Sequence, residues 1–343
     1  MASLKPRSRG LSARRREVRY VSSIVRQCLL LAVFSGIVCG QQRPVRVYLI
    51  GTGAPEITME RAGQSTLISL DTNHFLFDAG RHTLQGLYKA RIAPQEVTRI
   101  FLTHLHNDHI EGLPPLWMTP WFLLRRRQGL EIWGPPGTAN MIAGMRQMFA
   151  HDIERRSNET LKKEFLDIEV HEIGPGTVYA AGDMTITAVE VEHHDGNPAF
   201  GYRFDAAGRS VLLTGDATLT ANLLEAGNGV DILISNVASG TPRLEGSGAI
   251  DPILNKLMKP EQAARLFLTT GPRLAVYSHI VKKGLPGKLG DDEIIARTRK
   301  AGFEGGLVMG LDGMQIVIGD EIQLTQPQPS DDLPELDGAG LIF

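Results

Sequence analysis

A short apolar strand that runs directly into a cluster of histidines constrains this chain more than any other feature. The predicted strand Arg99–Leu102 is followed by His104, His106, Asp108 and His109. Alternate residues at a strand end point the same way, so the first two imidazoles can hold one cation, and the next turn can direct the other two side chains at a second. Histidine makes up only 10 of 343 residues, so three within six positions are improbable by chance. The pattern predicts a metal centre at the end of a strand.

The ligand chemistry is restricted to nitrogen and oxygen. The only cysteines, Cys28 and Cys39, both lie in the N-terminal segment. The remaining chain therefore offers no disulfide, no cysteine nucleophile and no thiolate ligand. Histidine nitrogen and carboxylate oxygen suit zinc, with manganese or iron as alternatives.

The first forty residues indicate targeting. A basic stretch leads into a twelve-residue apolar run, Cys28 to Cys39. This run is short for a bilayer span and suits a signal peptide that is cleaved before Gln41. We therefore expect residues 1–40 to be an export signal, and the mature protein to be periplasmic or secreted. An uncleaved membrane anchor is the alternative.

The charge balance argues against a nucleic-acid partner. The chain has 36 basic and 38 acidic residues, of which eight basic residues and one acid lie before residue 27. Residues 41–343 therefore carry a net charge of −9. An acidic body of this kind does not attract nucleic acid through its overall field.

The rhythm of the expected elements indicates a layered α/β fold. Hairpins are expected at 65–77 and 200–213, and strands alternate with helices from 232 to 301. This mixture predicts two mixed sheets packed between helices. We expect one domain over residues 45–320, with residues 114–165 as a helical cap over the site. Residues 323–343 are rich in Pro, Asp and Gln, which predicts a flexible tail.

His-x-His-x-Asp-His after a strand resembles the signature of the metallo-β-lactamase superfamily. Further pieces fall in the family's order: Gly51-Thr52-Gly53, Phe77-Asp78-Ala79-Gly80, His193, Thr214-Gly215-Asp216 and Tyr277-Ser278-His279. The resemblance covers residues 45–320 and implies an αββα four-layer sandwich.

The resemblance also implies a ligand set for two divalent metal ions. His104, His106 and His193 would hold one ion, Asp108, His109 and His279 the other, and Asp216 would bridge them. A hydroxide between the ions would then attack an ester, with Asp108 and His194 as the catalytic candidates. Asp78 is expected either to hydrogen-bond a ligand histidine or a loop from beneath the site, or only to form the turn before Gly80.

The third histidine must be chosen from an adjacent pair. In the branch of the family that carries Pro-Ala-Phe-Gly-Tyr-Arg downstream, the ligand lies five residues before the proline. Pro198 is that proline here. His193 is therefore predicted to be the ligand and His194 to face substrate or solvent, with the reverse assignment as the alternative.

The resemblance is greatest to the ribonuclease Z/arylsulfatase-like branch, through residues 103–117, 133–138 and 198–204. We expect a small ester substrate, either an aryl sulfate or a phosphodiester. The first alternative is 3'-tRNA processing by a ribonuclease Z-type enzyme. Against it, the His-Glu pair of that enzyme is replaced by Ser235-Asn236, and its proton-donating histidine by Leu257.

A lactonase or β-lactamase that attacks a carbonyl is the second alternative. A non-enzymatic protein with this fold would be expected to lose ligands, and all seven are present. The expected partner is a small-molecule ester, without nucleic acid and without stable membrane insertion beyond the N-terminal segment. The sequence leaves a homodimer open.

Overall fold

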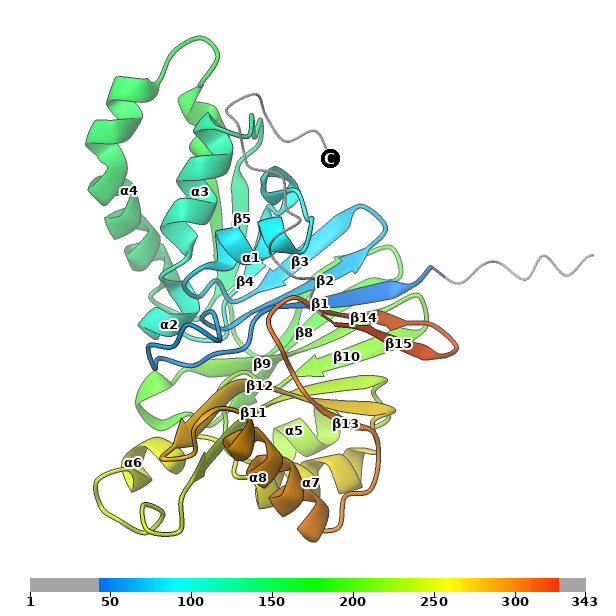
Figure 1. The fold of residues 1–343 in the computed structure, drawn as a ribbon. Coiled ribbons are helices and arrows are strands. Elements are labelled where there is room, and N and C mark those ends of the chain that lie inside the picture. The colour runs from blue at the N-terminus through cyan, green and yellow to red at the C-terminus, as the bar shows by residue number, and fades with distance from the viewer. Residues whose placement is uncertain (1–42, 327–343) are drawn as a thin grey trace, which may run out of the picture. The chain divides into compact units, whose positions relative to one another are not determined.

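The fold is built on two mixed β-sheets that face each other (Figure 1). The computed structural model describes residues 43–326, so the predicted export signal and residues 327–343 of the predicted tail lie outside the described residues. The larger sheet has eight strands in the order β15 (Ile322–Thr325), β14 (Met314–Ile318), β1 (Val45–Gly51), β2 (Ser65–Leu70), β3 (Asn73–Phe77), β4 (Arg99–Phe101), β5 (Leu130–Gly134) and β6 (Ile168–Glu172). The smaller sheet has seven, in the order β13 (Leu307–Met309), β12 (Leu274–Lys283), β11 (Ile232–Gly240), β10 (Arg209–Leu213), β9 (Ala199–Ala206), β8 (Met184–Val191) and β7 (Gly176–Ala181).

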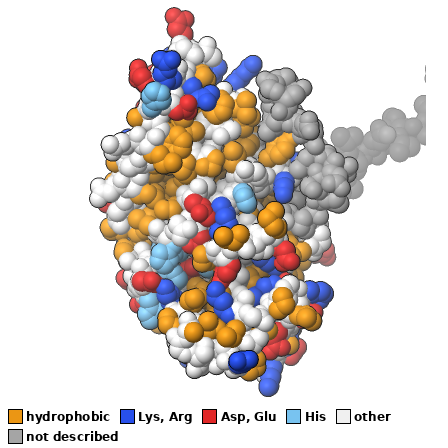
Figure 2. All heavy atoms as spheres, turned by 60° about the vertical axis from the view of Figure 1, so that its left-hand side comes forward, with side chains coloured by type: hydrophobic (Ala, Val, Ile, Leu, Met, Phe, Trp, Pro, Cys, Tyr) orange, Lys and Arg blue, Asp and Glu red, His pale blue; other side chains and the backbone are white. Residues whose placement is uncertain are grey.

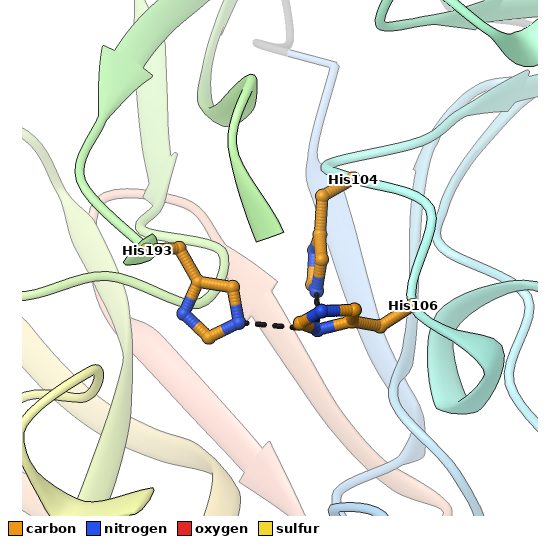
Figure 3. A group of neighbouring side chains, drawn as sticks. All are labelled: His104, His106 and His193. Carbon is orange, nitrogen blue, oxygen red and sulfur yellow. Dashed lines mark hydrogen bonds between the residues drawn. The ribbon is translucent and has the colours of Figure 1, made fainter. Parts of the chain in front are cut away.

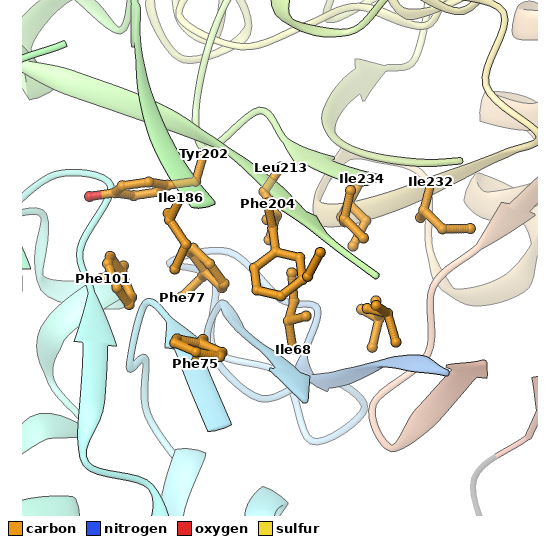
Figure 4. Packing of buried hydrophobic residues seen from close by; sticks show 14 of the residues in the cluster. Ile68, Phe75, Phe77, Phe101, Ile186, Tyr202, Phe204, Leu213, Ile232 and Ile234 are labelled. Carbon is orange, nitrogen blue, oxygen red and sulfur yellow. The ribbon is translucent and has the colours of Figure 1, made fainter. Parts of the chain in front are cut away.

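The main core fills the space between the sheets (Figure 4). Aromatic rings dominate one end of it: Phe77 stacks on Phe101 at a centroid distance of 5.3 Å, and Phe101 stacks on Trp133 at 4.6 Å. Tyr202 from the opposite sheet lies edge-on to Phe101 and donates its hydroxyl to the carbonyl of Leu102. Burying an aromatic or aliphatic side chain of this size contributes about 1.5–3 kcal/mol. This packing fixes the end of β4, from which the histidine motif begins.

Helices cover the outer face of each sheet (Figure 1). A second apolar cluster joins the eight-stranded sheet to its covering helices, and a third does the same for the seven-stranded sheet. The helices on the first side are α1 (Thr83–Lys89), α3 (Leu113–Phe122) and α4 (Thr138–Arg156), and those on the second are α5 (Ala221–Ala226), α7 (Pro260–Thr270) and α8 (Gly287–Lys300). The predicted four-layer sandwich is confirmed.

The predicted helical cap at residues 114–165 is wrong. Strand β5 lies within this range and pairs with β4 on one side and β6 on the other. Trp117 and Trp121 of α3 are fully buried in the second apolar cluster. These residues therefore form an outer layer and a strand of the sandwich itself. Helix α4 ends at Arg156, before the end of the range predicted to be helical.

Helix α3 contains a proline whose effect is repaired by a buried arginine. Pro120 has no N–H, so the carbonyl of Leu116 lacks its usual helical partner. Arg126 donates to that carbonyl at 3.1 Å and to the carbonyl of Trp117 at 2.7 Å. Burial lowers the pKa of Arg126 to about 10, so the guanidinium stays charged at neutral pH. The buried arginine therefore stabilises the end of a helix that its proline would otherwise weaken.

The end of the domain also differs from the prediction. Residues 322–325 form β15, which pairs antiparallel with β14, so the fold continues past residue 320 and into the predicted tail. Strands β6 and β7 were not predicted, because both lie at sheet edges and most of their residues are at least partly exposed. Within residues 43–326, no helix has the length and apolar character needed to cross a membrane.

Candidate metal centre

Strand ends bring the seven predicted ligands together. The motif that begins at His104 follows β4 and continues into the short helix α2 (Asn107–Ile110). His193 follows β8, Asp216 follows β10, and His279 lies in β12. Four segments that are far apart in sequence thus converge at one edge of the two sheets.

Three imidazoles form the first group (Figure 3). His104 Nε2 lies 2.9 Å from His106 Nδ1, which lies 3.3 Å from His193 Nε2. Tetrahedral ligands held 2.0–2.1 Å from zinc are roughly 3.3 Å apart. The spacing of these nitrogens therefore fits three ligands of one ion.

The second group combines two imidazoles and a carboxylate. Asp108 Oδ2 lies 3.2 Å from His279 Nε2 and 3.6 Å from His109 Nε2. Asp216 Oδ2 lies 3.1 Å from His279 Nε2, 3.5 Å from His109 Nε2 and 3.7 Å from His193 Nε2. Asp216 is therefore within ligand spacing of both groups, which is the position a bridging carboxylate needs.

Buried polar atoms test whether this set fits metal ions. His109 Nε2 and Asp216 Oδ1 are buried and have no hydrogen-bond partner among the described residues. Leaving such atoms unsatisfied is costly, and a coordinated cation removes the cost. The donor set of nitrogen and carboxylate oxygen also suits divalent cations. The residues present therefore fit a pair of divalent ions.

The structure separates His193 from His194. His193 is buried, and its Nδ1 donates to the carbonyl of Lys256 at 3.2 Å, which leaves Nε2 directed at the first group. His194 is exposed and belongs to none of the ligand groups. The geometry favours His193 as the ligand, while a catalytic role for His194 stays a prediction.

A buried carboxylate orients the ligands from below. Asp78 accepts from His109 Nδ1 at 2.8 Å and from the backbone N–H of Thr103 at 2.8 Å. The hydroxyl of Thr103 also contacts Asp78 and lies 3.0 Å from His104 Nδ1. Carboxylate partners of this kind fix the tautomer and the ring angle of metal-binding histidines. Of the two roles expected for Asp78, the structure therefore shows the bond to a ligand histidine.

Three residues around the centre have left-handed backbone. Asp78, His194 and His279 have φ values of 59°, 52° and 43°. Non-glycine residues adopt this conformation at a cost, and such strain tends to collect at functional sites. These backbone conformations therefore lower the stability of the folded protein somewhat, but they orient the three side chains.

The pKa values of the histidines differ with their surroundings. Burial and the neighbouring imidazoles lower the pKa of His104 well below its ordinary value. Burial alone would also lower the pKa of His109, but the carboxylates of Asp78 and Asp216 outweigh it and raise that pKa well above the ordinary value. The carboxylates therefore favour the protonated form of His109, whereas burial and the neighbouring imidazoles favour the neutral form of His104.

Metal binding is therefore expected to release a proton from His109. Coordination needs the free electron pair of Nε2, so zinc affinity should weaken as the pH falls, by about tenfold per pH unit for each proton displaced. Titration calorimetry in buffers of different ionisation enthalpy measures the released protons. Asp78→Asn removes a carboxylate that raises this pKa and should reduce the release. A zinc affinity that does not change between roughly pH 6 and pH 8 would contradict the assignment.

A glycine that the sequence alone did not single out packs over the first group. A Cβ atom at Gly196 would lie 2.1 Å from His193 Cδ2, 3.0 Å from His106 Cε1 and 3.1 Å from His104 Cδ2. Such distances are too short for a side chain, so only glycine lets this turn cover all three rings. The position is recognisable only in three dimensions, because two of its three partners, His104 and His106, are distant in sequence.

Gly196→Ala is expected to weaken binding of one zinc ion by at least about tenfold, because displaced imidazoles lose the geometry that tetrahedral zinc needs. Gly144→Ala is the matched control, since a Cβ atom at Gly144, inside α4, would contact no other element within 4 Å. That change should stabilise the helix by about 0.5–1 kcal/mol. Metal content after dialysis against a weak chelator, with thermal melting, checks both. If Gly196→Ala still binds two ions as tightly as the wild type, the imidazoles can shift to accommodate the methyl group and the prediction is wrong.

A second cluster of ligand-type residues lies elsewhere on the described surface. Glu131, Glu169 and His171 bring their ligand atoms within 4.8 Å of one another. Glu131 pairs with Arg99 at 3.7 Å, and the Glu169 side chain is 69% exposed. Because an arginine already supplies the positive charge, this cluster is an ordinary ion-pair network at the edge of the sheet.

Figure 2 shows a face of the molecule on which histidine side chains reach the surface beside apolar side chains, with acidic and basic side chains interspersed. His106 is half-buried, whereas His104 and His109 are fully buried. Of these three ligands, His106 is therefore the one that is partly accessible.

Comparison with known proteins agrees with this site. The beta-lactamase superfamily domain matches residues 73–280. A ribonuclease Z from Mycolicibacterium gilvum (strain PYR-GCK) is 30% identical over 291 residues, which cover 83% of this chain and 97% of that protein. A ribonuclease Z from Mycobacterium sp. (strain KMS) is 31% identical, with coverage of 72% and 88%.

Two solved structures show the same fold. The metallo-beta-lactamase fold protein YhfI from Bacillus subtilis has a TM-score of 0.61 at 18% identity and covers 80% of this chain and 99% of its own. The short form of human tRNase Z has a TM-score of 0.60 at 20% identity, with coverage of 79% and 98%. With its seven converging ligands, its four layers and these relatives, the chain belongs to the metallo-β-lactamase superfamily, on the side of the superfamily that includes ribonuclease Z.

Proposed function

We propose that the protein hydrolyses phosphodiesters at the seven-residue metal centre. The observation that carries the proposal is a complete ligand set in a chain that aligns with 97% of a ribonuclease Z. These relatives support the ribonuclease Z-type activity, which was the first alternative drawn from the sequence, better than they support hydrolysis of an aryl sulfate. Cleavage of an RNA phosphodiester is therefore the first activity to test.

The roles of the chain's own residues follow from their positions. When bound, two divalent ions, most simply zinc, supply hydroxide near neutral pH and neutralise charge that develops on the ester. Asp216 lies between the two ligand groups and sets their spacing. Asp78 holds His109 in one orientation. Asp108, in the second group, lies 3.2 Å from His279 Nε2 and would hold the second ion with it.

Small aryl esters are the second candidate, and Leu257 is the observation that favours them. This residue stands where the resemblance places the proton-donating histidine of ribonuclease Z. Its side chain is only 4% exposed and packs in an apolar cluster with Ala54, Leu254 and Val281. That position can donate no proton, which favours substrates whose leaving group departs unaided. The acidic charge of residues 41–343 also favours a small substrate over a polynucleotide.

A panel assay tests the proposal. Zinc-loaded protein is incubated with a pre-tRNA, an aryl phosphodiester, an aryl sulfate, a lactone and a cephalosporin, beside Asp216→Asn as the control for contaminating hydrolases. Cleavage of either phosphodiester that disappears in Asp216→Asn supports the proposal. Hydrolysis of the aryl sulfate, the lactone or the cephalosporin alone would overturn it.

A further inference from the structure

Asn236 occupies a β-bulge beside one of the proposed ligands. In the parallel pair β11–β12, Ser235 is opposite Tyr277, and Val237 is opposite Ile280. One residue of β11, Asn236, therefore faces two of β12, Ser278 and His279. Bulges of this kind redirect side chains and are frequent next to active sites. His279 has left-handed backbone at this point, which turns its ring toward Asp108.

The side-chain amide of Asn236 holds the turn that carries Asp216. Its Nδ2 donates to the carbonyl of Gly215 at 2.8 Å and to the carbonyl of Ala217 at 3.1 Å. These two residues flank Asp216 directly. The same nitrogen lies 3.2 Å from the hydroxyl of Thr214, which also accepts from the backbone N–H of Asn236 at 3.1 Å. The turn is thus fixed on both sides of the proposed bridging carboxylate.

The other end of the amide holds a second segment. Asn236 Oδ1 accepts from the backbone N–H of Met258 at 2.9 Å. Two residues earlier, the carbonyl of Lys256 accepts from His193 Nδ1 and so sets the angle of that ring. The backbone of Ala238 also donates to the carbonyl of Met258. The 256–258 turn is therefore anchored on β11 and in turn orients His193.

We propose that Asn236 is a positioning residue for the metal centre, linking the bridging Asp216 to His193 and His279. The inference rests on the proposed function in one respect, that these three residues are metal ligands. Asn236 is 2% exposed, so none of its bonds can be replaced by bulk water without opening the fold. Residues that orient ligands in this way typically contribute 10–100-fold to metal affinity.

In this chain the bonds of the side chain are those of an amide. Asn236 donates to two carbonyls at one end and accepts from an N–H at the other, a combination that an amide group provides. Aspartate has the same shape, but it would place a carboxylate oxygen against the carbonyls of Gly215 and Ala217. A buried charge that faces acceptors is unfavourable. Asn236→Asp is therefore expected to push the Asp216 turn away from the centre while conserving the packing volume.

Metal affinity is the readout, because it does not depend on the substrate. Zinc affinity is measured by chelator competition, the visible spectrum of cobalt-substituted protein reports ligand geometry, and melting of the metal-free protein reports folding. Asn236→Asp should bind zinc about 10–100-fold more weakly and alter the cobalt spectrum. Asn222→Asp is the matched control, since Asn222 is exposed and donates to the carbonyl of Glu190, away from the ligands. It should match the wild type.

Two outcomes would overturn the inference. One is an Asn236→Asp protein whose zinc affinity and cobalt spectrum match the wild type while only its melting temperature falls. If Asn236→Asp does not fold, Thr214→Val is used instead, which removes the hydroxyl that lies 3.2 Å from Asn236 Nδ2. This variant should bind zinc measurably more weakly. An unchanged zinc affinity is the second outcome that would count against the inference. Wild-type protein that holds two ions and cleaves no phosphodiester would refute the proposed function and leave these comparisons intact.

Discussion

His193→Ala is expected to lose one metal ion and to lower hydrolysis by at least about 100-fold, whereas His194→Ala keeps both ions. Removing a residue that only orients a ligand already costs about 10–100-fold in metal affinity, so removing the ligand should cost more. His193 Nε2 lies within ligand spacing of His106 and Asp216. His194 is exposed, and its backbone N–H bonds to Glu192. Any loss in His194→Ala should therefore appear in turnover alone.

Metal content and turnover must be measured on the same samples of both variants. The two substitutions are chemically identical and adjacent, so each serves as the control for the other. A His194→Ala protein that loses an ion beside a His193→Ala protein that keeps both would mean that the proline spacing points to the wrong residue. Equal losses in the two variants would indicate that the turn as a whole, held by Glu192 and Asn197, had unfolded.

The seven residues that the structure brings together could be predicted from the sequence because they are local or ordered. Three histidines and an aspartate within six positions, directly after an apolar strand, are enough to indicate a metal site. His193, Asp216 and His279 needed the order of the family motifs, since each is a single residue after or within a strand. Strands on both faces of the core, such as β1 and β8, are recognisable in the sequence because their apolar residues alternate or run together.

What could not be predicted depends on contacts between distant segments. Gly196 looks like any loop glycine until three rings lie beneath it. Asn236 appeared only as a departure from a relative's pattern, and its four partners come from two other segments. Helix α5 begins only at Ala221, because the residues before it form the turn that follows Asp216 and Thr220 caps the helix. Edge strands β6 and β7 carry too little apolar pattern to be recognised.

The second large effect is expected in the dependence of rate on the leaving group. Leu257 is buried among apolar side chains, so it gives no proton to the departing oxygen. Help from a general acid is typically worth about 10²–10⁴-fold. Without it, the oxygen must leave as an anion, and the rate should fall steeply as the pKa of the leaving alcohol rises. Aryl phosphodiesters should then be hydrolysed faster than alkyl phosphodiesters bound in the same way, because the alkyl esters lack the roughly 10²–10⁴-fold help that a general acid gives.

The measurement is a series of substituted phenyl phosphodiesters and a pre-tRNA, with log(kcat/KM) plotted against leaving-group pKa.

Two nearby groups could supply the proton instead. Lys256 Nζ lies 2.7 Å from Asp195 beside the first ligand group, and His194 is exposed on the same turn. If one of them acts as the acid, the wild-type plot is shallow and becomes steep in Lys256→Met or His194→Ala. The plot could also stay shallow in both variants while the protein cleaves pre-tRNA efficiently. That result would show that Leu257 does not slow the departure of poorly acidic alcohols, since none of these side chains would then be supplying the proton.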